Sequence, residues 1–344
     1  MTSGSTGVPK VTLRTHAQQW HRCLSYSIDS GVSALDCYLG VLDIGLNTGR
    51  NQCLAQIMAG GTVVISHART LADLVAEIER HKVTWTYIVP AQLRRMARAA
   101  TGRAPLLPQL RLLMTGAAPL YGAERRAVVE RISPRLSIQY GANDCGRFTT
   151  LAPEEVLAYP ESVGRPHVGV EAQVVDDQHR PVPPGTVGLI RFRSAGYPTG
   201  YYRDPEATAR GYRDGWFYPG DLAAIDENGY VYLKGRADDL INYAGLKINP
   251  LEVEAALLAY PGVLEAAVIG WRRGSEQHPI GLVVSQAAID EAALKAFLRE
   301  HIASHKVPHR ILRIVELPRN AMGKIDKPAL ERHLQRFEGL LPKP

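Results

Sequence analysis

The hydrophobic and polar positions of the first 140 residues repeat with two different periods. The apolar residues of 71–82 recur at helical spacing, whereas the β-branched run after Gly60-Gly61 is typical of a buried strand. The same alternation predicts strands at 62–65, 83–89, 110–114 and 136–140, and helices at 71–82, 91–100 and 121–132. The mixed pattern of residues 20–61 predicts no element. Alternating helices and strands indicate an α/β layered sheet.

The pattern changes after Thr150, where short β-rich runs are separated by proline and glycine. These runs predict antiparallel strands at 170–175, 187–193, 223–225 and 231–234. A smaller α+β unit follows from Asp238, with helices predicted at 250–260 and 290–304, a strand at 263–269 and a polar C-terminal tail. The charged turn at 235–239 lies between two apolar runs, so we predict domains of residues 1–236 and 237–344.

Composition excludes several classes of protein. A chain of 344 residues that is 45% hydrophobic and 22% charged can form two folded domains. The net charge of +6 comes without a long basic block, so it suits anionic small ligands, and we expect no nucleic-acid partner. The four cysteines form no metal-binding pattern, which indicates reduced thiols and a cytoplasmic protein. No apolar run reaches the ~18 residues that a membrane span needs, so we expect no membrane-spanning segment.

Residues 2–10 form a stretch of small hydroxyl residues and glycines that ends in a lysine. Glycines let the backbone approach a polyanion closely, while the hydroxyls and the Lys10 ammonium can donate to phosphate oxygens. The stretch has neither the Gly-Lys-Ser/Thr of a Walker motif nor a preceding strand. From these residues alone, a phosphate-binding loop and a flexible tail are both possible.

Two further segments, 115–119 and 140–144, directly follow predicted strands. Ligands of layered α/β sheets usually bind at loops beyond the carboxyl ends of strands. Both segments are therefore candidate ligand loops.

Seven short motifs stand in order along the chain. They are Thr-Ser-Gly-Ser-Thr-Gly-Val-Pro-Lys at 2–10, Gly-Ala-Ala-Pro-Leu at 116–120, Tyr-Gly-Ala-Asn-Asp at 140–144, Gly-Tyr-Tyr-Arg-Asp-Pro-Glu-Ala-Thr at 200–208, Gly-Trp-Phe-Tyr-Pro-Gly-Asp at 215–221, Gly-Arg-Ala-Asp-Asp-Leu-Ile at 235–241 and Asn-Ala-Met-Gly-Lys-Ile-Asp-Lys at 320–327. Together they resemble the adenylate-forming superfamily of acyl-CoA synthetases, luciferases and peptide-synthetase adenylation domains. The resemblance implies an α/β fold with two domains. The large domain is truncated and has a layered αβ sheet and a β-rich portion, and the small C-terminal domain is mobile and α+β.

Members of this superfamily activate a carboxylic acid with ATP, release pyrophosphate and pass the acyl group to a thiol. The resemblance implies that the loop 2–10 binds the β- and γ-phosphates, while the backbone of 116–117 and the Tyr140 ring enclose the adenine. Asp221 would accept hydrogen bonds from the ribose hydroxyls, with Arg236 beside it. The full set of implied ATP-binding residues is Thr2, Ser3, Gly4, Ser5, Thr6, Gly7, Lys10, Gly116, Ala117, Ala118, Tyr140, Gly141, Asn143, Asp221 and Arg236.

The resemblance also implies a catalytic lysine and a hinge in the smaller domain. Lys324 matches the lysine that reaches between the substrate carboxylate and the α-phosphate, where a fixed cation stabilises the transition state. Asp238 matches the hinge about which the small domain rotates between the two half-reactions. Ala244-Gly245 match a loop that lines the thiol channel.

The chain departs from the family pattern in three places. Asn143-Asp144 replaces a Thr-Glu whose Glu binds Mg²⁺; an Asp keeps the hard oxygen donor, so Asp144 is the metal candidate. Residues 43–49 contain neither the His nor the aromatic that relatives often place at the acyl pocket, and Asp43 is interpreted as a loop or capping carboxylate. The family's N-terminal subdomain has no counterpart before Thr2, so we expect a partner segment that supplies it, or a homodimer formed through exposed strand edges.

Three hypotheses for function follow from these motifs. The leading one is an AMP-forming acid:CoA ligase that uses ATP, Mg²⁺ and coenzyme A on a small carboxylic acid, because residues 241–254 are closer to the ligase style than to the peptide-synthetase style. The second is an adenylation module that loads the phosphopantetheine arm of a carrier protein. The third is an inactive fragment that binds nucleotide.

Overall fold

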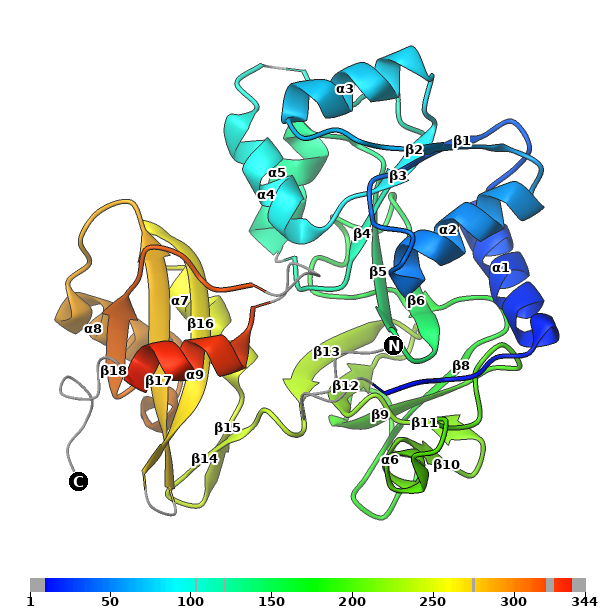
Figure 1. Ribbon diagram of the computed structural model, residues 1–344. Coiled ribbons are helices and arrows are strands. Elements are labelled where there is room, and N and C mark those ends of the chain that lie inside the picture. Colours follow the sequence, from blue (N-terminus) through cyan, green and yellow to red (C-terminus); the bar gives the residue numbers. More distant parts are fainter. Residues whose placement is uncertain (1–9, 103, 121, 274–275, 320–324, 336–344) are drawn as a thin grey trace. The chain divides into compact units, whose positions relative to one another are not determined.

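The computed structural model describes residues 10–102, 104–120, 122–273, 276–319 and 325–335. The chain divides into two compact units, Met1–Leu233 and Lys234–Pro344 (Figure 1). The division falls within a strand, β13 (Val231–Arg236). The roles that the sequence assigns to residues 1–236 and 237–344 stay predictions.

The first unit is built on a seven-stranded sheet with the strand order β2-β1-β3-β4-β5-β6-β7. The strands β1 to β5 pair in parallel, and β5, β6 and β7 pair antiparallel. Their bounds are β1 Cys37–Gly40, β2 Thr62–Ile65, β3 Trp85–Tyr87, β4 Leu112–Gly116, β5 Leu136–Ala142, β6 Gly146–Leu151 and β7 Arg165–Pro166. The predicted α/β layered sheet is confirmed.

Helices cover both faces of this sheet (Figure 1). Leu74, Leu93 and Val128 pack with Leu113 on one face, whereas Tyr26 and Ala55 pack with Trp85 and Met114 on the other. These residues place α3 (Leu71–Arg80), α4 (Pro90–Ala99) and α5 (Gly122–Arg131) against one face, and α1 (His16–Ser30) and α2 (Asn47–Met58) against the opposite face. The inner parallel strands are therefore buried between two helical layers, whereas Thr62 and Ile65 of the edge strand β2 are exposed.

The elements α1, β1 and α2 lie in the region where the sequence predicted nothing. A capping box at Thr15 and Gln18 starts α1, and Gly31 ends it in a left-handed conformation with φ of 58°. The buried face of α2 includes Gln52 and Gln56, so no apolar stripe marks it. The sequence pattern did not predict α2 because polar side chains occupy the face of the helix that packs against the sheet.

A second sheet of the first unit is antiparallel in every pair that the described residues show. Its strand order is β10-β11-β9-β12-β13, with β8 paired to β9. The ring of Phe148 stacks on Phe192 with centroids 4.2 Å apart, inside a core shared by both sheets. The bounds are β8 Glu171–Val175, β9 Gly188–Arg193, α6 Pro205–Gly211, β10 Tyr212–Arg213, β11 Trp216–Phe217 and β12 Asp221–Ile225.

The second unit is an α+β body around the sheet β16-β17-β18. Its elements are β14 Ile241–Tyr243, β15 Leu246–Ile248, α7 Pro250–Leu258, β16 Val263–Arg273, β17 Glu276–Ser285, α8 Glu291–His301, a short 3₁₀ turn Ser304–Lys306, β18 Arg310–Arg313 and α9 Lys327–Gln335. The prediction of a polar tail is wrong for residues 327–335, because Leu330 and Leu334 are fully buried there. Two leucines four residues apart lie on one helix face and pack against the sheet.

None of the described helices combines the length and the apolar character that crossing a bilayer requires.

Glu254 on α7 is a buried carboxyl group in the second unit, and its Oε1 accepts a hydrogen bond from the Val268 amide at 2.8 Å. Burial raises the pKa of Glu254 to about 7, although the Val268 amide and the Lys327 charge act in the opposite direction. A carboxyl group with a raised folded-state pKa stabilises the fold below its unfolded pKa, and that contribution is lost as the pH rises through about 7.

We therefore expect Glu254→Gln, which keeps the carbonyl acceptor, to remove part of the pH dependence of stability. Between pH 5 and pH 8, wild type should lose about 2 kcal/mol more unfolding free energy than the variant. Urea unfolding at both pH values measures this difference. Equal losses in the two proteins would show that Glu254 is already ionised at pH 5.

Candidate active site

The loop after β4 brings main chain close to the neighbouring strand. A Cβ at Gly116 would lie 2.3 Å from the Gln139 carbonyl oxygen and 2.8 Å from the Tyr87 hydroxyl, so no larger residue fits. Ala117 has a φ of 69°, a left-handed conformation that costs a non-glycine residue free energy and is concentrated at functional sites. The half-buried Ala117 and Ala118 thus expose main chain at the carboxyl end of β4.

Tyr140 lies at the carboxyl end of β5, the adjacent parallel strand, and its ring is half-buried. The ring packs edge-on against Phe148, 5.3 Å away, and the hydroxyl donates a hydrogen bond to Oδ2 of Asp221. A register shift follows between Tyr140 and Gly141, where a Cβ would lie 2.2 Å from the Gly146 carbonyl oxygen. The structure therefore brings together the predicted adenine-binding ring and the predicted ribose-binding carboxylate.

Asn143 and Asp144 form the tip of the β5–β6 hairpin, and two other side chains hold it. Nη2 of Arg14 donates to the Asp144 carbonyl at 2.6 Å, and Nδ2 of Asn47 donates to the Asn143 carbonyl at 2.9 Å. Burial lowers the pKa of Arg14, but the guanidinium group still carries its charge next to the hairpin. Sequence reasoning missed Arg14 and Asn47, since nothing local marks either as a hairpin partner.

The Asp144 carboxylate is suited to a metal ion. Its Oδ1 is buried and has no hydrogen-bond partner among the described residues. A buried carboxylate oxygen without a partner is costly unless a cation or donor satisfies it. No group of three or more His, Cys, Asp or Glu side chains in the described part of the chain could hold a metal. This donor set fits Mg²⁺, which binds through one or two carboxylates together with substrate phosphates and water.

Lys10 is the described end of the predicted phosphate loop. Its ammonium lies 5.0 Å from the centre of the Tyr201 ring. Thr12 forms an antiparallel bridge with Tyr201. The remaining loop candidates lie outside the described residues: Thr2, Ser3, Gly4, Ser5, Thr6 and Gly7.

In the second unit, Arg236 and Asp238 form a two-point ion pair. Nε and Nη2 of Arg236 donate to the two carboxylate oxygens of Asp238 at 2.8 and 2.9 Å. Burial raises the pKa of Asp238, but the Arg236 interaction outweighs burial and the pKa is lowered overall. The predicted ribose neighbour and the predicted hinge residue thus contact each other.

Ala244 and Gly245 form the turn between β14 and β15, and both are exposed. Their φ values of 49° and 78° are those of a two-residue type I′ hairpin turn. Their predicted place in a thiol channel stays a prediction.

Lys324 lies outside the described residues. Arg319 and Ile325 are the described residues on either side of it, and they form an antiparallel bridge with each other. Lys327 pairs with Asp239 at 2.6 Å, which ties the start of α9 to the segment that carries Asp238.

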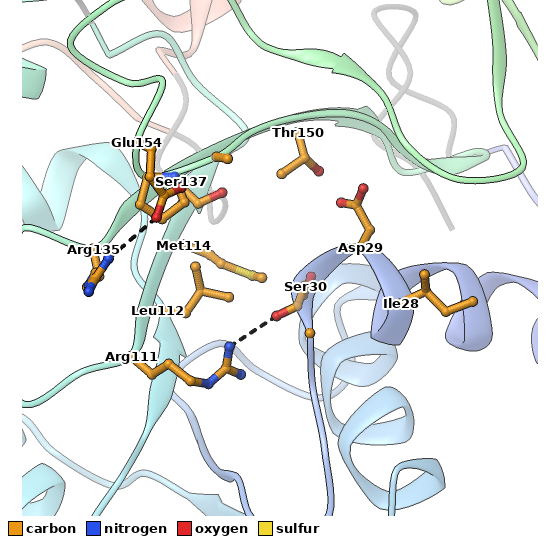
Figure 2. Close-up of a pocket in the computed structure, with 13 residues that line it drawn as sticks. Ile28, Asp29, Ser30, Arg111, Leu112, Met114, Arg135, Ser137, Thr150 and Glu154 are labelled. Atoms are coloured by element: carbon orange, nitrogen blue, oxygen red, sulfur yellow. Dashed lines mark hydrogen bonds and ion pairs between the residues drawn. The ribbon is translucent and has the colours of Figure 1, made fainter.

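A cavity of about 580 Å³ lies at the other end of the sheet, where β4 and β5 begin (Figure 2). Its charged groups are already paired, since Arg111 contacts Asp36 and Arg135 contacts Glu154. The predicted nucleotide residues 116–118 and 140–143 lie at the opposite, carboxyl ends of these strands. We therefore place the candidate active site at the loops 116–118 and 140–144 and not in this cavity.

Two family models match this chain. The family model described as AMP-binding enzyme matches residues 1–202, and the model for its C-terminal domain matches residues 252–324. This chain belongs to the AMP-binding enzyme family. The predicted resemblance to the adenylate-forming superfamily and the predicted fold class are confirmed.

Several relatives of this AMP-binding enzyme are acid:CoA ligases. It is 33% identical to the 2-succinylbenzoate–CoA ligase of Geobacillus kaustophilus over 99% of this chain and 69% of that protein. It is 31% identical to the feruloyl-CoA synthase of an Amycolatopsis species over 96% of this chain and 68% of that protein. The chain spans about two thirds of the length of these relatives. The ligase interpretation is confirmed at the level of the family.

Solved structures with nucleotide share the fold of this AMP-binding enzyme. The O-succinylbenzoate CoA synthetase MenE from Bacillus subtilis, in complex with ATP and magnesium ion, matches with a TM-score of 0.86 and 27% identity over 97% of this chain and 68% of that one. ATP-bound MatB from Rhodopseudomonas palustris matches with a TM-score of 0.88 and 28% identity over 98% of this chain and 67% of that one.

Proposed function

We propose that this AMP-binding enzyme is an AMP-forming acid:CoA ligase that acts on a small carboxylic acid. The observation that supports it most is the hydrogen bond from the Tyr140 hydroxyl to Asp221, because it joins an aromatic face to a carboxylate beside an exposed main-chain loop. A purine needs a flat partner, and a ribose diol needs an acceptor. Tyr140 and Asp221 supply groups of these two kinds next to the carboxyl ends of β4 and β5, where ligands of such sheets usually bind.

In the first half-reaction, the substrate carboxylate attacks the α-phosphorus of ATP, an acyl-adenylate forms and pyrophosphate leaves. Tyr140 and the 116–118 main chain hold the base, and Asp221 holds the ribose. Lys324 supplies the cation between the two anions that must meet. Asp144 would hold Mg²⁺, which neutralises charge on the phosphates.

In the second half-reaction, the CoA thiol attacks the acyl carbonyl, a thioester forms and AMP leaves. The hinge at Asp238 and the turn at Ala244-Gly245 serve this step in the proposal. Residues near the hinge are already ordered by the Arg236–Asp238 and Lys327–Asp239 ion pairs. CoA is favoured over a carrier protein because relatives across several genera are named CoA ligases.

We propose an aromatic acid as the substrate class. The acids named in three kinds of relative are 2-succinylbenzoate, ferulate and a substituted naphthoate. Their shared chemistry is a carboxylate attached to or conjugated with an aromatic ring.

The cellular setting and association state are also proposals. The cysteines are free thiols, and Cys23, Cys53 and Cys145 are buried, which suits the reducing cytoplasm. In the described part of the sheet, β2 pairs with β1 alone and leaves an edge that favours a homodimer or a supplementary segment.

ATP–pyrophosphate exchange by the purified chain with Mg²⁺ tests the adenylation step. The acid panel contains aryl, short-chain and medium-chain acids, and we expect exchange with at least one aryl acid. Thioester formation is then compared with free CoA and with a phosphopantetheinylated carrier protein. Transfer to the carrier alone would favour a loading module, and nucleotide binding without exchange for any acid would favour an inactive fragment.

A further inference from the structure

The cavity of about 580 Å³ at the starts of β4 and β5 has no role in the site described so far (Figure 2). It lies in the first unit, and its walls come from the C-terminal end of α1, from β4, β5 and β6, and from the turn after β6. Cavities of roughly 300–1,000 Å³ that combine apolar surface with a few polar groups are typical binding sites for small molecules. The chemistry of the walls indicates which kind of molecule fits.

One wall of the cavity is apolar. Leu112 and Met114 lie two residues apart on β4, so their side chains face the same side of the sheet, and both are buried. Ile28 of α1 adds an apolar side chain that is 56% exposed. A thioether makes favourable contacts with aromatic rings, so this wall suits a ring.

A second wall carries a carboxylate and a hydroxyl group. Oγ1 of Thr150 is buried and has no hydrogen-bond partner among the described residues. Oδ2 of Asp29 is also buried and accepts no hydrogen bond from them, although Nη2 of Arg147 lies 3.3 Å away. Buried polar atoms without partners are costly, and a ligand that hydrogen-bonds to them removes that cost. A hydroxyl group suits this wall, because it can donate to Asp29 and accept from Thr150.

The donor that fits Asp29 is an uncharged one. Arg147 already compensates the charge of Asp29, and the two side chains are only 7% and 18% exposed. An ammonium group would bring a further positive charge, without a partner of its own, into this buried place. A hydroxyl group donates the same hydrogen bond without that charge.

Two arginines line the cavity on the side away from Asp29 (Figure 2). The Arg111 side chain is 42% exposed, whereas its partner Asp36 is 6% exposed and does not line the cavity. The Arg135 side chain is 54% exposed, and its contact with Glu154 is 3.4 Å long and exposed, which makes it a weak pair. Both guanidinium groups can therefore donate hydrogen bonds to a carboxylate of a ligand.

We propose that this cavity is a second binding site of the chain, separate from the candidate active site, for a hydroxylated aromatic carboxylate. The carboxylate pairs with Arg111 and Arg135. The ring packs on Met114, and the hydroxyl group bonds to Asp29 and Thr150. Binding here needs neither ATP nor turnover, so the proposal goes beyond the proposed function. Ferulate carries all three groups and is the acid named in one relative, which makes it the probe.

Nuclear magnetic resonance of the chain with ¹³C-methyl-labelled methionine locates ferulate binding. Spectra are recorded without ATP while ferulate is added, and Met114→Leu and Met96→Leu assign the two resonances. We expect the Met114 resonance to shift, because the ring lies against its methyl group. Met96 is buried in the core on the other face of the sheet, and its resonance should keep its position. An unshifted Met114 resonance at millimolar ferulate would overturn the proposal.

Thr150→Val and Arg135→Ala test the two polar ends of the site. Thr150→Val removes a hydroxyl that has no partner, so the melting temperature should stay the same while the Kd for ferulate rises about fivefold. Arg135→Ala should raise this Kd about 10-fold, because a charge-assisted hydrogen bond is lost. Arg299→Ala is the control, since Arg299 is exposed on α8 of the second unit, and it should leave the Kd unchanged. A Met114 shift that neither Thr150→Val nor Arg135→Ala weakens would place ferulate elsewhere and overturn the proposal.

3-Methoxycinnamate is the matched control ligand, because it is ferulate without the phenolic hydroxyl group. It should bind wild type about fivefold more weakly than ferulate, and Thr150→Val should not weaken it further. An analogue with an ammonium group in place of the hydroxyl should bind more weakly than ferulate. Tighter binding of that analogue, or equal losses for ferulate and 3-methoxycinnamate in Thr150→Val, would contradict the assignment of the hydroxyl group.

The outcomes separate this proposal from the proposed function. An unshifted Met114 resonance in a chain that catalyses pyrophosphate exchange would overturn the second site and leave the ligase function intact. A Met114 shift that Arg135→Ala weakens, in a chain without exchange for any acid, would support the second site and count against the proposed function.

Discussion

Replacement of Lys324 with alanine should reduce adenylate formation by about 10³-fold, because the transition state then lacks the cation between the carboxylate and the α-phosphate. Thioester formation from preformed acyl-adenylate should stay within about threefold of wild type, since no phosphoryl transfer occurs in that step. The two half-reactions are measured as pyrophosphate exchange and as CoA-dependent consumption of synthetic adenylate.

Lys306→Ala is the control for Lys324→Ala in the same unit. Lys306 forms an ion pair with Glu252 at 2.7 Å, and it lies outside the motif at 320–327. Its removal should leave both half-reactions unchanged. Equal losses of the two half-reactions in Lys324→Ala would contradict the assigned role and indicate a general effect on the small unit.

Replacement of Asp221 with alanine should raise the KM for ATP by roughly 10- to 100-fold, because a charge-assisted hydrogen bond to the ribose contributes about 1.5–3 kcal/mol. The change also leaves the Tyr140 hydroxyl without its acceptor. Tyr140→Phe keeps the ring and should change the KM by less than about fivefold, whereas Tyr140→Ala should approach the effect of Asp221→Ala.

Glu227→Ala offers a matched carboxylate control, since Glu227 is exposed in the turn between β12 and β13. Initial rates at varied ATP and saturating acid give KM and kcat for each protein. An unchanged KM for ATP in Asp221→Ala would place the ribose elsewhere. Wild type should have a higher KM for 2′-deoxy-ATP than for ATP. Asp221→Ala should have similar KM values for the two nucleotides.

The parts of the site that follow directly from strand ends could be predicted from the sequence. The segments 116–118 and 140–144 follow apolar runs that form β4 and β5, and parallel strands necessarily place their carboxyl ends together. The local motif spacing was therefore sufficient to place Gly116 and Tyr140 at one edge of the sheet.

Contacts between distant segments could not be predicted in this way. Arg14 reaches Asp144 and Tyr201 reaches Thr12 only because the fold brings those segments together. No spacing rule links residues so far apart, and a single sequence carries no covariation. The side chains that contact the candidate loops were consequently missed, whereas the position of the loops at strand ends was predicted.

The helix α2 shows a different limit of sequence reasoning. Its buried Gln56 accepts a hydrogen bond from the Trp85 indole at 2.7 Å, and the buried Gln52 accepts from the Tyr38 hydroxyl. Hydrogen bonds satisfy these amide oxygens in the core, so polar residues occupy positions where an apolar stripe is expected. By contrast, Leu330 and Leu334 of α9 do show helical spacing, and that signal was present in the sequence.

The β5–β6 hairpin carries both Tyr140 and Asp144, and Arg14 and Asn47 hold its tip. The ring assigned to the base and the carboxylate assigned to the metal are therefore a set distance apart on one backbone segment. In the proposed function ATP covers that distance with its ribose and phosphates, so we expect the hairpin to discriminate nucleotides by length as well as by base. We expect AMP, with its shorter phosphate chain, to contact the Tyr140 end and leave the Asp144 end unsatisfied, which would favour its release after the second half-reaction.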